Sequence, residues 1–367
     1  METKTNSNNI RNKNERETLF DSLKGIAMLG VILTHSGAAE LPGLLGQISA
    51  FGARGVQMFF IISAILTFHS LESLENDKKS IKNWYFNKFL RLIPLYYISL
   101  IFYYCTIGFK PNYWTGNQPI NVITICLNIL LLHGLNPWYI NAINVNWYIG
   151  TLTLFIIIAP LLYKRINNLS KSILFFSVSW IIALVAQIIL TKFYVGEDVY
   201  IWSAYWSNFS LISELPVIAL GIILYYLIYK ENIIKTLRNK MIKLEKPKVV
   251  MNILTFCIFL CLGEKIIYNA SLISYSILFG VLIFIQMLNS NSLIDNKIFA
   301  FLGRNSYCIY LFHYPIINIL TNLYSKYILN KYILIVIVIW STIILCTIIS
   351  CIFAKIIEKP IISKLKK

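Results

Sequence analysis

The sequence predicts an all-α integral membrane protein with about ten transmembrane helices, one short re-entrant or interfacial helix, and both termini in the cytoplasm. Three observations predict this fold class. The 367 residues are 57% apolar and 13% charged, whereas soluble domains carry about 25% charged residues. Uncharged windows alternate with short basic connections. The formal net charge of +17 comes from Lys and Arg that gather in only some of these connections.

Each predicted span corresponds to a window that lacks Asp, Glu, Lys and Arg. A helix needs about 20 largely apolar residues to cross roughly 30 Å of hydrocarbon, and most windows reach that length, some with their flanks. Period-two alternation is absent, so an outer-membrane barrel fits poorly. The windows are residues 25–39, 55–71, 92–109, 111–163, 172–191, 215–229, 249–263, 266–294, 305–325 and 332–354.

The connections set the orientation, because cytoplasmic loops carry an excess of Lys and Arg. Six basic clusters hold 27 of the 33 basic residues, and the other connections hold the remaining six. We therefore place the six clusters, and both termini, in the cytoplasm. The basic excess then meets membrane lipids, and no nucleic-acid partner is expected. The clusters lie before residue 25 and at residues 78–91, 164–171, 230–248, 297–304 and 355–367.

The stretch 120–132 is apolar but has only 13 residues, roughly 20 Å as a helix. If it crossed the membrane, every later basic cluster would lie outside. We interpret it as a re-entrant or interfacial helix on the outer face. The alternative is a short true span followed by a later helix that does not cross.

The chain divides into three predicted parts. Residues 1–19 form a charged cytoplasmic tail, residues 20–357 a polytopic membrane domain, and residues 358–367 a basic cytoplasmic tail. The seven cysteines all fall in apolar stretches without a CxxC pair, so we expect small buried hydrophobes rather than a disulfide or a metal site.

Two of the four histidines, His35 and His313, fall inside predicted spans. An ionisable group there must face the bundle interior or a wet cavity, and it is a functional candidate. Histidine, with a pKa of about 6.5, can take a hydroxyl proton and return it at neutral pH. His69 and His133 fall near span ends, where we expect solvated or interfacial side chains. His35 is the leading candidate for chemistry between a cytoplasmic donor and an acceptor on the far side.

Several motifs resemble those of the membrane acyltransferase family 3. The segment from Phe20 to His35 is similar to the family's first-helix signature, with Lys24 where Arg is usual. Gly55–Ser63 resembles the second motif, with Ala64 in place of Gly, and Lys88–Tyr96 resembles the Arg-rich entry to the third span, with Lys88 replacing the first Arg.

The remaining matches follow in order along the chain. They are Trp147 with Pro160, the segment Leu302–His313 and the terminal Glu358-Lys359-Pro360. Many members carry a Glu pair where this chain has Leu152 and Thr153, and this departure points towards the branch that acetylates surface glycans.

The resemblance implies transfer of an acyl group, commonly acetyl from cytoplasmic acetyl-CoA, to a hydroxyl of an extracytoplasmic glycan. The glycan would be a capsular or other surface polysaccharide, or a lipid-linked sugar, at a bacterial cell membrane. His35 would act as the general base or as a transient acyl carrier. Lys24, Lys88 and Arg91 would hold the donor's phosphates, although plain positive-inside anchoring explains them as well.

Other residues have less definite expected roles. His313, Ser63 and Ser306 are candidates for supporting His35 or joining its chemistry. Trp138, Asn146 and Trp147 are candidates for binding the acceptor, since flat rings stack on sugar faces, but an interfacial aromatic belt is the main alternative. Glu214 is expected at a capping or rim position. No tightly bound cofactor or metal is expected.

Two other functions stay open at this stage. A transporter or flippase for a glycan intermediate would explain the aromatic rim and the internal histidine, but the paired halves typical of transporters are not apparent. A membrane scaffold in a capsule-export complex would leave His35 without a purpose.

Overall fold

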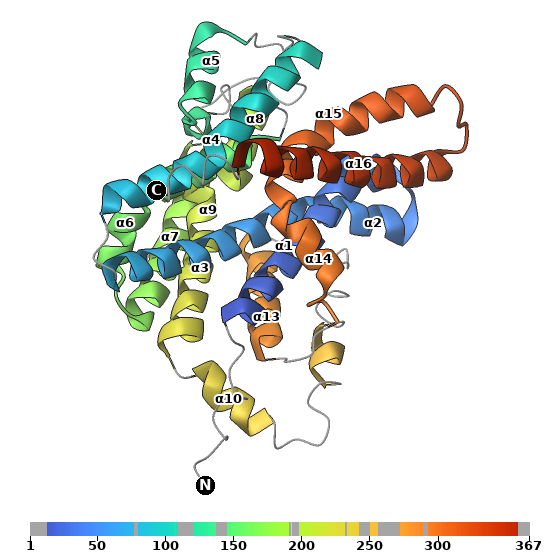
Figure 1. Ribbon diagram of the computed structural model, residues 1–367. Helices are drawn as coiled ribbons and strands as arrows, with labels where there is room; N and C mark the ends of the chain where they lie inside the picture. The colour runs from blue at the N-terminus through green and yellow to red at the C-terminus, as the bar shows by residue number, and fades with distance from the viewer. Residues whose placement is uncertain are drawn as a thin grey trace.

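The computed structural model is predominantly helical, and no strand occurs among its described residues. These residues are 13–76, 80–106, 108, 120–136, 145–190, 192, 198–231, 233–241, 250–255, 272–288 and 293–358. Figure 1 shows their arrangement. The helices are α1 Lys13–His35, α2 Gly43–Phe51, α3 Gly55–Asn76, α4 Ile81–Thr106, α5 Val122–Ile129, α6 Trp147–Arg165, α7 Leu169–Leu190, α8 Asp198–Asn208, α9 Leu211–Tyr225, α10 Ile233–Met241, α13 Leu272–Leu288, α14 Lys297–Arg304, α15 Ser306–Tyr324 and α16 Lys331–Phe353. Short 3-10 turns are η1 Ala38–Glu40, η2 Gly52–Arg54 and η3 His133–Leu135, and π-helical ends are η6 Tyr226–Lys230 and η7 Ala354–Glu358.

Six helical segments of the described chain are long and apolar enough to cross a membrane. They confirm the prediction of an all-helical, multi-pass membrane protein. α13 is apolar but shorter, and the predicted spans 249–263 and 266–294 fall partly outside the described residues. The total of ten spans and the cytoplasmic termini therefore stay predictions. The six segments are Gly43–Asn76, Ile81–Thr106, Trp147–Arg165, Leu169–Leu190, Trp202–Lys230 and Lys331–Ile356.

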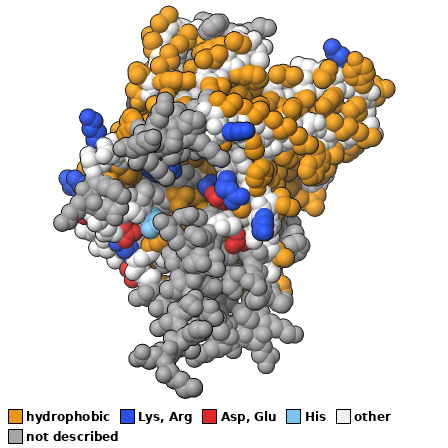
Figure 2. Space-filling view, viewed as in Figure 1, with side chains coloured by type: hydrophobic (Ala, Val, Ile, Leu, Met, Phe, Trp, Pro, Cys, Tyr) orange, Lys and Arg blue, Asp and Glu red, His pale blue; other side chains and the backbone are white. Residues whose placement is uncertain are grey.

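The helices α7 and α16 expose more apolar surface than a water-soluble fold would. Ile181 on α7 and Trp340 on α16 are 61% and 63% exposed. Figure 2 shows hydrophobic side chains covering the upper and right-hand parts of the face in view, where α15 and α16 lie side by side. An apolar surface of this extent fits contact with lipid chains, which need no hydrogen-bonding partners.

The short helix α5 supports the interpretation of residues 120–132 as re-entrant or interfacial. Its eight residues extend about 12 Å, well short of the hydrocarbon thickness. Asn121 caps its start by accepting a hydrogen bond from the Thr124 amide at 2.8 Å. Leu131, with a φ of 59°, turns the chain away from the helix two residues after its end.

The far ends of α3, α6 and η6 meet around two carboxylates. Lys230 Nζ lies 2.5 Å from Glu72 Oε1, and Tyr225 donates to Glu72 at 2.9 Å. Tyr163 at the end of α6 donates to Glu75 at 3.1 Å. Three of the basic connections that we assign to the cytoplasm thus start from one end of the bundle.

α1 is held between two helix crossings at which the backbones touch. A Cβ on Gly303 of α14 would lie 1.7 Å from Asp21 O, and a Cβ on Gly25 would lie 2.1 Å from Phe299 O. On the other side, a Cβ on Gly52 would lie 2.1 Å from Gly30 O. No larger residue fits these positions without a backbone shift. The glycines of the first-helix and Leu302-Gly303 motifs therefore have a packing role: they fix the helix that carries His35.

Candidate functional site

His35 lies at the last residue of α1 beside His313 of α15. The two ring centroids are 5.3 Å apart, and the planes are inclined by 48°. The hydroxyl of Thr34 donates to Ser49 O of α2 at 2.6 Å, which anchors this end of α1. His35 is half-buried, whereas His313 is fully buried. One ring of the pair is thus in the bundle interior, and the other is partly accessible.

The hydrogen bonds of His313 assign its tautomer. Its Nδ1 lies 2.7 Å from Tyr310 O and 3.2 Å from Ile309 O, and since carbonyl oxygens only accept, Nδ1 carries the proton. Nε2 then carries the lone pair, and it has no partner among the described residues. Pro315 follows two residues later inside α15, where its ring distorts the preceding turn.

The ring of His35 makes no hydrogen bond to any described residue, and it stands edge-on to Tyr314, with centroids 5.5 Å apart. A neutral imidazole without a partner has a nitrogen free to accept a proton from a hydroxyl. Because an unpaired polar ring in a membrane bundle is costly, this arrangement is typical of a functional group rather than of packing.

A row of aromatic rings continues from this pair into the bundle. Tyr310 lies 5.8 Å from His313 and 5.4 Å from Tyr148 of α6, measured between ring centroids. Tyr310 donates to Val145 O, and Ser63 of α3 is 3.3 Å from the Tyr148 hydroxyl. Ser63 thus joins this row through Tyr148, at the other end from His35.

The predicted donor-binding residues lie around the junction of α14 and α15. Lys24 forms a 2.8 Å ion pair with Asp21, whose backbone packs on Gly303. Tyr307 at the start of α15 donates to Leu92 O of α4 at 2.7 Å, next to Arg91. Arg91 is exposed.

Lys88 lies one turn before Arg91 on α4. It is half-buried, and its Nζ lies 5.3 Å from the centre of the Trp84 ring. Figure 2 shows Lys and Arg side chains gathered in the middle of the face in view, below the broad hydrophobic area. The junction therefore brings three helices with basic residues together. Ser306, at the first position of α15, is buried there as well.

The predicted acceptor residues are in different surroundings from those expected. Trp138 lies outside the described residues. Asn146 is fully buried, and its Nδ2 donates to Tyr96 Oη at 3.0 Å and to Asn128 Oδ1 at 2.8 Å. Trp147 is half-buried, with its ring 4.8 Å from that of Phe209. The structure places Asn146 in an internal network, where it holds α4, α5 and α6 together.

Three sequence expectations are wrong. His133 is fully buried rather than solvated, because it stacks on Tyr96 and donates to Asn146 O at 3.1 Å. Glu214 is not at a rim: it is fully buried in the first turn of α9 and accepts from Gln57 at 2.9 Å. The cysteines were expected to be buried, but three of those described are exposed on helices with apolar surfaces. These three are Cys105, Cys126 and Cys351.

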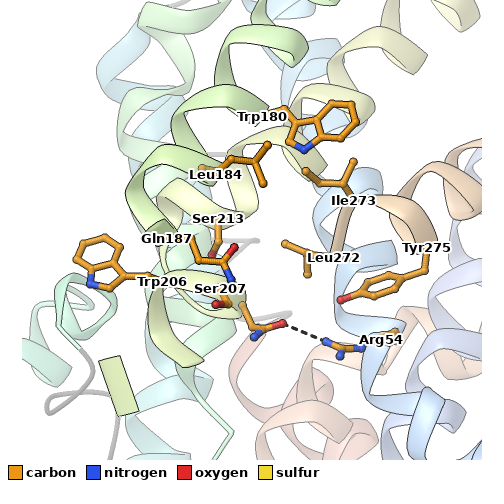
Figure 3. Close-up of a pocket in the computed structure, with 12 residues that line it drawn as sticks. Arg54, Trp180, Leu184, Gln187, Trp206, Ser207, Ser213, Leu272, Ile273 and Tyr275 are labelled. Atoms are coloured by element: carbon orange, nitrogen blue, oxygen red, sulfur yellow. Dashed lines mark hydrogen bonds between the residues drawn. The ribbon is translucent and has the colours of Figure 1, made fainter. Parts of the chain in front are cut away.

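A cavity of about 180 Å³ that sequence reasoning missed lies between η2, α7, α8, α9 and α13 (Figure 3). Arg54, the last residue of η2, donates to Asn208 Oδ1 at 3.4 Å and lies 4.7 Å from the centre of the Tyr275 ring. The signal in the sequence was a single Arg directly before an uncharged window, which resembles any loop charge. Its neighbours come from segments far apart along the chain, so spacing could not reveal them.

Comparison with known proteins gives a consistent result. A family model described as an acyltransferase domain matches residues 18–354. The O-acetyltransferase OatA of Staphylococcus aureus strain NCTC 8325 is 23% identical over 337 residues, covering 84% of this chain and 51% of the relative. OatA of strain COL gives the same values. The chain thus spans about half the length of the curated relatives it matches. No solved structure matches it.

Proposed function

Because the chain belongs to acyltransferase family 3, and because His35 and His313 lie together inside its helices, we propose that it is an integral-membrane O-acyltransferase that uses His35 as its base. The acyl group is acetyl, and the donor is acetyl-CoA from the cytoplasm. The acceptor is a hydroxyl of an extracytoplasmic glycan, such as a capsular or other surface polysaccharide of a bacterial cell. The printed name of the relatives, O-acetyltransferase, supports the acetyl group.

One observation carries the proposal: the half-buried His35 ring makes no hydrogen bond to a described residue and lies 5.3 Å, between ring centroids, from His313, whose Nε2 is also unpaired. In the reaction, an imidazole nitrogen of His35 takes the proton of the acceptor hydroxyl. The oxygen forms a bond to the thioester carbonyl carbon, and the C–S bond breaks. The proton then passes to the departing thiolate, which leaves as CoA thiol.

His313 acts as a positioning residue in this scheme. Its Nδ1 proton is committed to the backbone of its own helix, so its lone pair at Nε2 faces its surroundings in a fixed tautomer. A fixed neutral neighbour keeps the base orientated without placing a second positive charge beside it. The ring contacts of Tyr310 with His313 and with Tyr148 hold α15 against α6.

The donor's phosphates bind at the α14–α15 junction, where Lys24, Lys88 and Arg91 supply the positive charge. Arg91 provides a planar fork for a phosphate, and the two lysines act as point charges. The ion pair of Lys24 with Asp21 lowers its share, so Arg91 and Lys88 carry most of the binding.

The test is the amount of base-labile acetate in the surface polysaccharide of cells that carry the wild-type protein, none, or the His35→Ala variant. We expect His35→Ala to match the cells without the protein, because general-base catalysis contributes about 10²–10⁴-fold. His69→Ala is the matched control. His69 is half-buried and stacks on Tyr229 near the C-terminal end of α3, so this variant should leave acetylation unchanged. Full acetylation by a normally inserted His35→Ala variant would overturn the proposal.

A further inference from the structure

We propose that the cavity beside Arg54 binds an anionic sugar unit of the acceptor, apart from the unit whose hydroxyl reacts. This inference rests on the proposed function in one respect, namely that the acceptor is a glycan. It adds a second binding site on the protein and a negative charge on the glycan. The site residues lie on different helices from the histidine pair.

The lining of the cavity has two chemically different sides. Figure 3 shows Gln187 and Ser207 on one side, and Leu272 and Ile273 across from them. Asn208 also lines the cavity. Trp180 lies at one end, and Arg54 lies at the other. A sugar ring has the matching character, because its hydroxyl edge hydrogen-bonds with amides and hydroxyls while its C–H face packs on apolar and aromatic groups. The volume of about 180 Å³ suits one ring rather than a polymer segment.

Arg54 gives the cavity its charge preference. A guanidinium has five N–H donors, more than its long contact with Asn208 and its position over Tyr275 use. It is half-buried, so the charge is less well solvated than on an open surface. A planar guanidinium pairs with a carboxylate or phosphate through two parallel hydrogen bonds. An anionic substituent on the sugar would accept hydrogen bonds from the unused N–H donors of Arg54 and neutralise its charge.

Buried polar atoms without partners surround the same place. Glu214 Oε2 and Gln57 Oε1 have no partner among the described residues, and these side chains are 0% and 2% exposed. Glu214 directly follows Ser213, which lines the cavity. Trp206 Nε1, from another lining residue, is also unpaired. Buried polar groups are normally satisfied, so these atoms leave hydrogen-bonding capacity next to the cavity.

The cavity is near enough to His35 to hold the same glycan chain. The backbones of Gly30 and Gly52 touch, and Arg54 is two residues from Gly52 while His35 is five from Gly30. The Cα atoms of His35 and Arg54 are therefore within about 20 Å of each other. A glycan of a few units covers such a distance, so one unit can lie in the cavity while a neighbour presents its hydroxyl to His35.

The test is a calorimetric titration of the solubilised full chain with the trimer of galacturonic acid and, as the neutral match, the trimer of galactose. We expect the acidic trimer to bind more tightly, and Arg54→Gln to weaken it about tenfold or more by removing a charge-assisted pair. Arg54→Lys should recover part of the loss. Lys326→Gln, which removes an exposed charge at the α15–α16 connection, is the control and should bind as the wild type does.

Equal binding of the two trimers, no binding of the acidic trimer, or an unchanged affinity in a folded Arg54→Gln variant would overturn this inference. His35→Ala separates it from the proposed function: that variant should bind the acidic trimer normally and transfer no acetyl. If His35→Ala acetylates the surface polysaccharide, the proposed function fails, whatever the titration shows.

Discussion

Two buried histidines, His313 and His133, have nearly the same local bonding but different neighbours. Each donates one ring N–H to a backbone carbonyl, and each leaves its other nitrogen without a partner among the described residues. His313 adjoins the half-buried ring of His35. His133 instead stacks on the fully buried Tyr96.

The difference shows that an unpaired nitrogen does not by itself mark a reactive site. Around His133, the Asn128 Oδ1 accepts from both Tyr96 and Asn146, so three segments are tied together by side chains. Such a network specifies how buried helices pack. Around His313, the nearest polar ring is one that has access to the surface. We therefore propose that His133 has a packing role and that His313 positions the catalytic base.

Among the variants that test this comparison, His313→Phe is expected to reduce acetyl transfer the most. Phenylalanine keeps the ring volume but removes both the Nδ1 donor that fixes the tautomer and the unpaired Nε2. We expect acetyl transfer to fall about 100-fold, since a positioning error at a catalytic group has that order of cost. The melting temperature should hardly change. The measurements are the rate of thiol release from acetyl-CoA and a thermal melt; unchanged transfer would return His313 to a packing role.

A second comparison contrasts two buried helical glycines. Gly303→Ala places a methyl group against the Asp21 backbone, so α1 and α14 must separate; overpacking of this kind costs about 1–3 kcal/mol or more. Transfer should fall as well, because α1 carries His35. Gly280→Ala is the control, since the nearest atom to its new Cβ is 4.0 Å away. Thermal melts of both variants check this, and equal stability would show that the α1–α14 crossing yields easily.

The smallest effect is expected from His133→Phe. The ring can still stack on Tyr96, and Asn146 O keeps its hydrogen bond from the Ile149 amide, so the variant loses one hydrogen bond, about 1 kcal/mol. Transfer should stay within a few-fold of the wild-type rate. A loss of activity as large as that of His313→Phe, at normal stability, would contradict the assignment of His133 to structure.

The spans that face lipid could be predicted from the sequence. The uncharged windows 172–191 and 332–354 correspond closely to α7 and α16, because a lipid-exposed helix needs apolar residues on all sides. The stretch around α5 was expected to be too short to span, and its helix has eight residues; its re-entrant or interfacial role stays a prediction. The polar interior was not predictable in the same way, because each network joins residues that lie far apart along the chain.

The site shows the same division. His35 and His313 could be selected singly, since an ionisable residue within a span is rare, but the sequence did not reveal that they adjoin across 278 positions. His133 was misjudged because its burial depends on Tyr96 and Asn146, which belong to other helices. Arg54 is one of the six basic residues outside the basic clusters, and its site could not be predicted, since its partners Asn208 and Tyr275 are more than 150 residues away.

The most direct test of the account uses the purified protein in lipid vesicles, with acetyl-CoA and the native surface polysaccharide stripped of acetyl groups by mild base. The rates of thiol release and of ester formation are compared between the wild type and His35→Ala. The account predicts that both fall together by about 100-fold or more in His35→Ala and stay unchanged in His69→Ala. Ester formation at the wild-type rate by correctly inserted His35→Ala would contradict it.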